Sequence, residues 1–210
     1  MWQTAAMAQL IYYCGTMDSG KSTLALQTAH NYESRGRHGL VFTNQDRAGS
    51  GIISSRLGLQ SPAIEVSSGM DIFAFVESHQ EAKGKLDYLI FDEAQFYESE
   101  QIDQLARIVD ILQVDVFAFG ILSDFRTSLF PGSMRLVELA DRVNPLQVEA
   151  LCWCGVRATH NARIVGGRMT REGDQLLPGD TAPDAQVLYE VLCRKHHMAN
   201  MSSKDHLKNG

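Results

Sequence analysis

Residues 15–23 read Gly-Thr-Met-Asp-Ser-Gly-Lys-Ser-Thr and match the phosphate-binding loop pattern G-x-x-x-x-G-K-[ST]. Residues 10–14 before the loop form a short apolar run, and residues 22–35 after it carry apolar or small side chains at helical spacing up to Gly36. A phosphate loop lies between a strand and a helix, because its backbone N–H groups and the helix N-terminus together surround the phosphates. The sequence therefore predicts a nucleoside-triphosphate site; the alternative is a glycine-rich turn with a surface lysine.

The residues of this loop have expected roles in binding ATP or GTP. Lys21 is expected to reach the β- and γ-phosphates, and Ser22 to ligate Mg²⁺. The remaining loop residues are expected to surround the phosphates: Gly15, Thr16, Met17, Asp18, Ser19, Gly20 and Thr23. Magnesium bound together with the nucleotide is therefore the first expected cofactor.

Composition limits the class of protein. The 210 residues suffice for one well-buried core and a small appendage. Hydrophobic residues make up 44% and charged residues 21%, and the apolar runs are too short and too interrupted by charge for a transmembrane helix. The chain start does not resemble a secretion signal, and a net charge of −6 argues against a nucleic-acid-binding surface, which needs clustered Lys and Arg. We expect a cytoplasmic enzyme with neither membrane nor nucleic acid as a partner.

Strand-like and helix-like segments alternate over the first two thirds of the chain. Apolar strands are predicted at residues 38–43, 86–91 and 114–120, and helices at residues 71–83, 98–112 and 132–141. Continuous apolar strands between helices are typical of a parallel sheet covered on both faces. The expected fold is an α/β P-loop core of the RecA-like kind, with helices flanking a parallel sheet, over residues 1–145.

The pattern changes after Pro145. Short alternating stretches at residues 147–152, 162–165 and 187–192 surround residues 166–184, which are rich in glycine, proline and acidic side chains. This polar segment cannot hold a core by itself, so we expect a loop there. Residues 146–197 are therefore predicted as a second, smaller domain and residues 198–210 as a disordered tail.

The predicted strand at residues 86–91 runs directly into Asp92 and Glu93. An aspartate that ends a strand beside a phosphate loop holds Mg²⁺, commonly through water. The adjacent Glu93 is then placed to take a proton from an attacking hydroxyl or water. The alternative for both residues is a solvated acidic turn after a strand.

Three of the four cysteines lie in the last third of the chain. Cys152 and Cys154 flank a tryptophan, and Cys193 precedes His196 by three residues. Three thiolates and one imidazole form a closed, structural zinc site, although the Cys-x-Cys pair is tighter than the usual spacing. Such a site would hold the two ends of residues 166–184 together. The alternative is three small buried residues followed by a basic tail, and Cys14 is expected in the core.

The motifs in this order resemble those of type II (cellular-type) thymidine kinases, from about residue 10 to residue 197. They are the phosphate loop, Asp92-Glu93-Ala94-Gln95-Phe96-Tyr97, Asp124-Phe125-Arg126 with Phe130, the cysteine pair followed by residues 158–163, and Tyr189 four residues before Cys193. The resemblance implies transfer of the γ-phosphate of ATP to the 5′-hydroxyl of thymidine, with deoxyuridine as an open second acceptor. It also implies a homotetramer inhibited by dTTP.

The resemblance also implies roles for individual residues. Glu93 matches the general base that deprotonates the nucleoside 5′-hydroxyl. The residues that match the thymine pocket or border the base are Met17, Phe96, Phe125, Phe130, Asn161, Arg163 and Tyr189. Residues 166–184 match the zinc-tethered lasso, which we expect to be mobile without nucleoside and closed over bound thymidine or dTTP. The alternatives are core positions for the phenylalanines, an ordinary strand position for Tyr189 and a solvated surface charge for Arg163.

Four positions depart from the family pattern. Asp18 stands where an aromatic residue is common and brings negative charge near the phosphates unless it points away. Asn161 stands where threonine is usual, and residues 122–123 replace a common acidic string. None of these departures removes a catalytic group.

Two other functions compete with the kinase. One is a helicase-like P-loop ATPase with a zinc ribbon that acts on nucleic acid, which would need a second core and a basic track. The other is a zinc-ribbon binding module that uses nucleotide as a switch, against which the intact phosphate loop, Asp92 and Glu93 argue.

Overall fold

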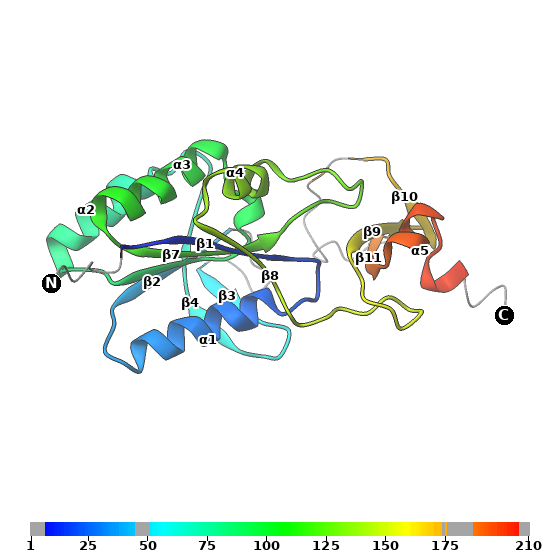
Figure 1. Ribbon diagram of the computed structural model, residues 1–210, viewed down its shortest axis with the longest axis horizontal. Helices are drawn as coiled ribbons and strands as arrows, with labels where there is room; N and C mark the ends of the chain where they lie inside the picture. The colour runs from blue at the N-terminus through cyan, green and yellow to red at the C-terminus, as the bar shows by residue number, and fades with distance from the viewer. Residues whose placement is uncertain (1–6, 45–50, 174, 176–186, 206–210) are drawn as a thin grey trace, which may run out of the picture.

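The computed structural model describes residues 7–44, 51–173, 175 and 187–205 (Figure 1). The larger unit is a six-stranded sheet with the strand order β5-β2-β6-β7-β1-β8, and every pair of neighbouring strands is parallel. These strands are β1 (Leu10–Gly15), β2 (Gly39–Thr43), β5 (Ile64–Glu65), β6 (Tyr88–Phe91), β7 (Asp115–Ile121) and β8 (Arg142–Pro145). The α/β P-loop architecture predicted from the sequence is confirmed.

Helices cover both faces of this sheet. Figure 1 shows α1 below the sheet and α2, α3 and α4 above it. The helices are α1 (Lys21–Glu33), α2 (Ile72–Lys83), α3 (Ser99–Arg107) and α4 (Pro131–Leu139), with the 3₁₀ turn η1 (Ala94–Phe96) after β6. A small antiparallel hairpin of β3 (Ile52–Ser54) and β4 (Gln60–Pro62) lies beside α1.

The continuous apolar strands form the core because both faces of the sheet are buried. All four residues of β6 are buried, and they divide between two clusters. Leu89 and Phe91 pack on the side of α2, α3 and α4, whereas Tyr88 and Ile90 pack on the side of α1. This two-sided burial fixes β6 in the middle of the sheet and carries its carboxyl end into the site.

Local sequence signals set where the helices begin. The Asp71 carboxylate accepts a hydrogen bond from the Ala74 N–H at 2.9 Å and caps α2. Glu98 and Gln101 form a capping box at the start of α3, and Pro131 occupies the first turn of α4. The predicted helix at residues 98–112 is in fact α3 followed by a π-helical turn, η2 (Ile108–Leu112).

The remaining described residues form a second unit, here called the C-terminal unit. It contains an antiparallel sheet in the order β10-β9-β11 and the short helix α5. Its elements are β9 (His160–Val165), β10 (Arg168–Thr170), β11 (Val187–Leu192) and α5 (Arg194–Met198). A core of its own surrounds Cys152, Ala162 and Leu192. In Figure 1 the C-terminal unit lies beyond one end of the large sheet.

In the second half, the structure adds several features to the sequence pattern. Residues 147–152 form no strand, and Leu151 makes only an isolated bridge to Arg157. The strands β8 and β10 were not predicted, because β8 is a largely exposed edge strand and β10 has only three residues. Beyond α5, the Ser203 hydroxyl donates to the Glu190 carboxylate at 2.7 Å. The predicted closing movement concerns residues 166–184, of which 174 and 176–184 lie outside the described residues.

Among the described residues, none of the helices combines the length and the apolar character that crossing a membrane requires.

Candidate active site

The parallel sheet gathers three segments at one edge. The phosphate loop follows β1, Asp92 and Glu93 follow β6, and residues 122–130 follow β7. Because β6, β7 and β1 are parallel neighbours, their carboxyl ends lie at the same edge of the sheet, the edge at which ligands bind in open α/β sheets. The topology therefore brings together motifs that lie far apart along the sequence, at residues 15–23, 92–93 and 122–130.

Two hydrogen bonds from side chains of the phosphate loop to its own backbone stabilise the loop. Lys21 is 8% exposed, and its ammonium donates to the Thr16 carbonyl at 2.8 Å. The Ser19 hydroxyl donates to the same carbonyl at 2.8 Å. Gly20 has a φ of +81° at the start of α1, a left-handed conformation that favours glycine. The loop thus leads directly into the N-terminus of α1, where an anion is stabilised.

Asp18 forms an ion pair with a residue outside the phosphate loop. Its carboxylate contacts the guanidinium of Arg56, which lies between β3 and β4. This partner explains how the family's aromatic position can hold an acid, since the charge is compensated by the hairpin. Sequence reasoning missed Arg56, because the hairpin lies about forty residues downstream with no spacing rule that links it to the loop.

Asp92 is a buried carboxyl group whose charge is only partly compensated by its neighbours. The residue is fully buried, and neither carboxylate oxygen has a hydrogen-bond partner of ordinary geometry among the described residues. Burial and the neighbouring Glu93 charge raise the pKa of Asp92 to about 7, and the nearby Ser22 hydroxyl and Lys21 offset only part of that rise. Oxygen ligands of this kind suit Mg²⁺, so the residues present fit the expected ion.

Glu93 has an unusual backbone. Its φ is +53°, in the left-handed region that non-glycine residues rarely adopt and that clusters at functional sites. Its carboxylate accepts a hydrogen bond from the Gln95 amide at 2.5 Å. The solvated acidic turn considered above is therefore wrong for this pair, because Asp92 is buried and Glu93 is held in a fixed position.

Two aromatic groups lie at the same edge of the sheet. Phe96 of η1 and Phe130 pack edge to face with ring centroids 5.7 Å apart. Phe125 is 3% exposed, and the Arg163 guanidinium lies 5.3 Å from its ring centroid. Tyr189 of β11 is paired directly across from Arg163 of β9, so both residues lie on one face of the small sheet.

Arg163 is buried rather than solvated. It is 9% exposed, and its Nε has no hydrogen-bond partner among the described residues. One terminal nitrogen donates to the Glu172 carbonyl at 3.4 Å. A buried guanidinium with an unused donor is costly unless something binds it, so the alternative of a surface charge is wrong.

Asn161 joins the two units. It is 3% exposed, and its Oδ1 accepts from the Met17 N–H at 2.8 Å while its Nδ2 donates to the Ser123 carbonyl at 2.9 Å. A residue of the C-terminal unit thus holds the phosphate loop and the loop after β7 at once. The sequence shows a departure from the usual threonine at this position but does not report the two contacts, because Met17 and Ser123 lie far from Asn161 along the chain.

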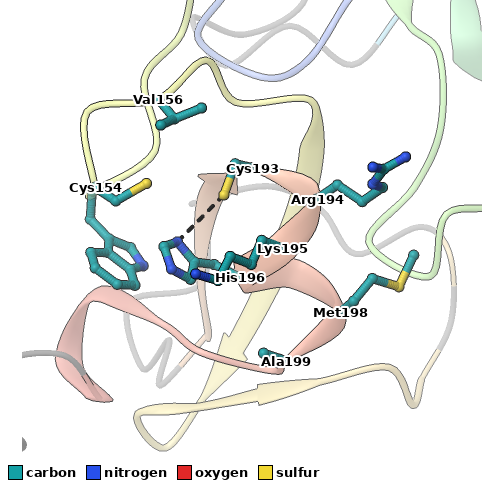
Figure 2. Close-up of a pocket in the computed structure, with 9 residues that line it drawn as sticks. Cys154, Val156, Cys193, Arg194, Lys195, His196, Met198 and Ala199 are labelled. Carbon is teal, nitrogen blue, oxygen red and sulfur yellow. Dashed lines mark hydrogen bonds between the residues drawn. The ribbon is translucent and has the colours of Figure 1, made fainter.

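The four expected zinc ligands are brought together. One ligand atom each from Cys152, Cys154, Cys193 and His196 lies within 4.8 Å of the others. The His196 Nδ1 is 3.4 Å from the sulfur atoms of Cys152 and Cys193, and a tetrahedral zinc would hold such atoms about 3.6 Å apart. Figure 2 shows Cys154, Cys193 and His196 converging. The residues therefore fit a structural zinc despite the tight Cys-x-Cys spacing.

The surroundings of the cysteine cluster favour a fixed geometry. The Trp153 ring stacks on the His196 ring with centroids 4.0 Å apart. The His196 backbone N–H lowers the pKa of the Cys193 thiol, whereas burial raises that of Cys152. His197 points elsewhere, with its Nε2 3.0 Å from the Phe125 carbonyl. The helix α5 therefore contacts both the cluster and the loop after β7, and Cys14 lies in the core as expected.

The fold and the loop geometry place the chain among the P-loop nucleotide-binding proteins. The family model described as thymidine kinase matches residues 8–197. A thymidine kinase of Streptomyces avermitilis is 61% identical over 198 residues, which cover 94% of this chain and 92% of that relative. A thymidine kinase of Cutibacterium acnes is 54% identical over 198 residues, with the same coverage of 94% and 92%. The chain belongs to the thymidine kinase family.

A likeness to a solved structure is weaker. The Pif1 helicase from Candida albicans is 15% identical, with a TM-score of 0.40 over 66% of this chain and 36% of that one. At that level the likeness has no bearing on function.

Proposed function

We propose that the chain transfers the γ-phosphate of ATP to the 5′-hydroxyl of thymidine, giving dTMP and ADP for nucleotide salvage. The thymidine kinases to which the chain is similar support this reaction. The observation that carries the proposal is the position of Glu93, held in a left-handed turn directly after the buried Asp92 and beside the phosphate loop. This arrangement puts a proton acceptor next to the group that is to be transferred.

The phosphate loop and Asp92 act on the nucleotide. The loop N–H groups and Lys21 bind the phosphates, and Ser22 and Asp92 hold the Mg²⁺ that accompanies ATP. When bound, this ion neutralises negative charge on the β- and γ-phosphates. The remaining loop residues, Gly15, Thr16, Met17, Asp18, Ser19, Gly20 and Thr23, shape the backbone that surrounds the triphosphate.

Glu93 acts on the acceptor. It takes the proton of the 5′-hydroxyl while the hydroxyl oxygen bonds to the γ-phosphorus and the bond from phosphorus to the bridging oxygen of ADP breaks. The proton therefore ends on Glu93 and the electron pair on the ADP leaving group. The aromatic and polar residues that border the base are Met17, Phe96, Phe125, Phe130, Asn161, Arg163 and Tyr189. The buried Arg163 donor supports a polar contact to the base or its sugar, whereas the hydrogen-bonded Asn161 amide supports an indirect role.

The C-terminal unit provides the second half of the acceptor site. We divide the chain into a nucleotide-binding core at residues 1–145, a zinc-binding domain at residues 146–197 and a tail at residues 198–210. Cys152, Cys154, Cys193 and His196 hold one structural Zn²⁺. The protein acts in the cytoplasm as a homotetramer that dTTP inhibits, and these properties follow from the family resemblance alone.

Transfer of labelled γ-phosphate from ATP to a panel of nucleosides tests the reaction. We expect thymidine to be the preferred acceptor and Glu93→Gln to lose about 10²–10⁴-fold in kcat with substrate binding retained. Glu100→Gln, an exposed glutamate in the first turn of α3, is the matched control and should behave as wild type. Near-normal kcat in Glu93→Gln would refute the base role. ATP hydrolysis that ignores nucleosides and responds to DNA or RNA would refute the kinase itself.

A further inference from the structure

We propose that Gln95 is a positioning residue for the transfer reaction and that it fixes the carboxylate of Glu93 toward the acceptor hydroxyl. The inference rests on the proposed base role of Glu93. Gln95 is 2% exposed and lies in η1, two residues after Glu93. A glutamine side chain buried this completely must use both ends of its amide, and here one end faces the base.

The two hydrogen bonds of Gln95 determine its orientation. Its Oε1 accepts from the backbone N–H of Ile121 at 3.0 Å, and its Nε2 donates to the Glu93 Oε2 at 2.5 Å. Because the Ile121 N–H can only donate, the carbonyl end of the amide must face β7, and the NH₂ end must face Glu93. The amide therefore has one allowed orientation, and in that orientation it binds one particular oxygen of the base.

Two glycines next to this turn leave the space that it needs. A Cβ on Gly120 of β7 would lie 2.8 Å from the Gln95 Oε1 and 3.1 Å from the Gln95 backbone N. A Cβ on Gly132 of α4 would lie 2.6 Å from the Ala94 carbonyl and 2.7 Å from the Tyr97 carbonyl. The turn that carries Gln95 is thus packed between β7 and α4, with backbone contact on both sides.

The anchor for Gln95 is itself held in the core. The Ile121 carbonyl accepts from the Ser133 hydroxyl at 2.7 Å and from the Tyr12 hydroxyl at 3.3 Å. These contacts join β7 to α4 and to β1, the strand that leads into the phosphate loop. The Gln95 amide therefore connects the Glu93 carboxylate to β7 of the rigid sheet, as a preorganised site requires.

A neutral donor suits this position. Gln95 occupies Oε2 and leaves Oε1 of Glu93 for the acceptor hydroxyl, so the base has one defined proton-accepting atom. A lysine or arginine would pair with the carboxylate as an ion and reduce its readiness to take a proton. The amide restrains the direction of the carboxylate while its charge is kept.

Replacing Gln95 by methionine tests the proposal, because methionine is unbranched and of similar length but cannot donate. We expect kcat for thymidine to fall roughly 10- to 100-fold, with the KM values for ATP and thymidine within about two-fold of wild type. Gly120→Ala keeps the amide and displaces it, and we expect a fall in kcat of the same order. The control is Gln101→Met: Gln101 is also 2% exposed, and its amide donates to the Ser67 and Met70 carbonyls. It should lose thermal stability without losing kcat.

The double variant separates positioning from structure. If Gln95 acts through Glu93, adding Gln95→Met to Glu93→Gln leaves kcat unchanged within about two-fold. An equal further loss in that background would overturn the proposal, and so would wild-type kcat in a folded Gln95→Met. If Glu93→Gln itself retains near-normal kcat, the proposed base role is refuted instead, so the two failures are distinguishable.

Discussion

Replacing Asp92 by asparagine removes a buried ionisable group whose negative charge is only partly compensated in the magnesium-free protein. The folded protein holds the Asp92 proton up to a pH of about 7, whereas an unstructured chain releases it near pH 3.8, because burial and Glu93 raise this pKa. The folded state therefore binds more protons than the unfolded state between these values, and the free energy of unfolding must fall as the pH rises through that window. Asparagine at this position cannot ionise, so the free energy of unfolding of the variant should not fall in this way as the pH rises.

The magnitude follows from the same rise in pKa. A change from 3.8 to about 7 corresponds to about 4 kcal/mol of free energy between pH 4 and pH 8. The asparagine amide has no ready partner in this site, which costs about 1–3 kcal/mol at every pH. We therefore expect a net stabilisation of about 1–3 kcal/mol at pH 8, or a melting temperature higher by about 2–12 °C. At pH 4–5 the variant should be the less stable protein.

Thermal melting from pH 4.5 to pH 8 measures this difference. The buffer should contain no magnesium and no chelator, so that zinc remains bound. Asp124→Asn is the control, because Asp124 is as buried but accepts hydrogen bonds from the N–H groups of Arg126 and Ser128. That control should be destabilised across the range. A difference between wild type and Asp92→Asn that does not change with pH would refute the reasoning.

Three further predictions concern the loop, the metal and the contact between the units. Lys21→Ala should lower activity by roughly 10³-fold or more with an unchanged circular-dichroism spectrum, since charge on the transferred group is no longer neutralised; full activity would contradict this. Metal analysis should find one zinc per chain in wild type and in His197→Ala, and less in Cys193→Ser; undiminished zinc in Cys193→Ser would refute the ligand set. Asn161→Ala should lose about 2–4 kcal/mol of unfolding free energy and raise the KM for ATP, because it strands the Met17 N–H and the Ser123 carbonyl; denaturant unfolding without loss would refute this.

The core of the fold could be predicted because its signals are local. Buried strands such as β6 and β7 are continuous apolar runs, and the phosphate loop imposes a strand before it and a helix after it. The edge strand β8 could not be predicted in this way, because only one side of it is paired and most of its residues are exposed. The π-helical turn after α3 also has no local signature, since the same apolar residues would fit a regular helix.

The site could be predicted only where chemistry and spacing coincide. Cys193 and His196 lie three residues apart, and Asp92 and Glu93 follow an apolar strand, so each group is visible in the sequence. The Asp18–Arg56 ion pair, the Asn161 bridge and the bond between Gln95 and Ile121 join segments that are distant along the chain. Such contacts depend on the tertiary fold, and no periodicity or motif reports them.

The contacts of the Asn161 amide also limit whether the two units can be separated or exchanged. The two units have separate apolar cores, so each looks like an exchangeable cassette. The phosphate loop, however, is partly held in place by the C-terminal unit, because the Met17 N–H donates to Asn161. A shortened chain that ends at β8 would keep the large sheet but would lose the hydrogen bond that Asn161 makes to the phosphate loop. A chimera with a foreign C-terminal unit would need, besides a zinc site, a side chain at position 161 that bonds both the Met17 N–H and the Ser123 carbonyl.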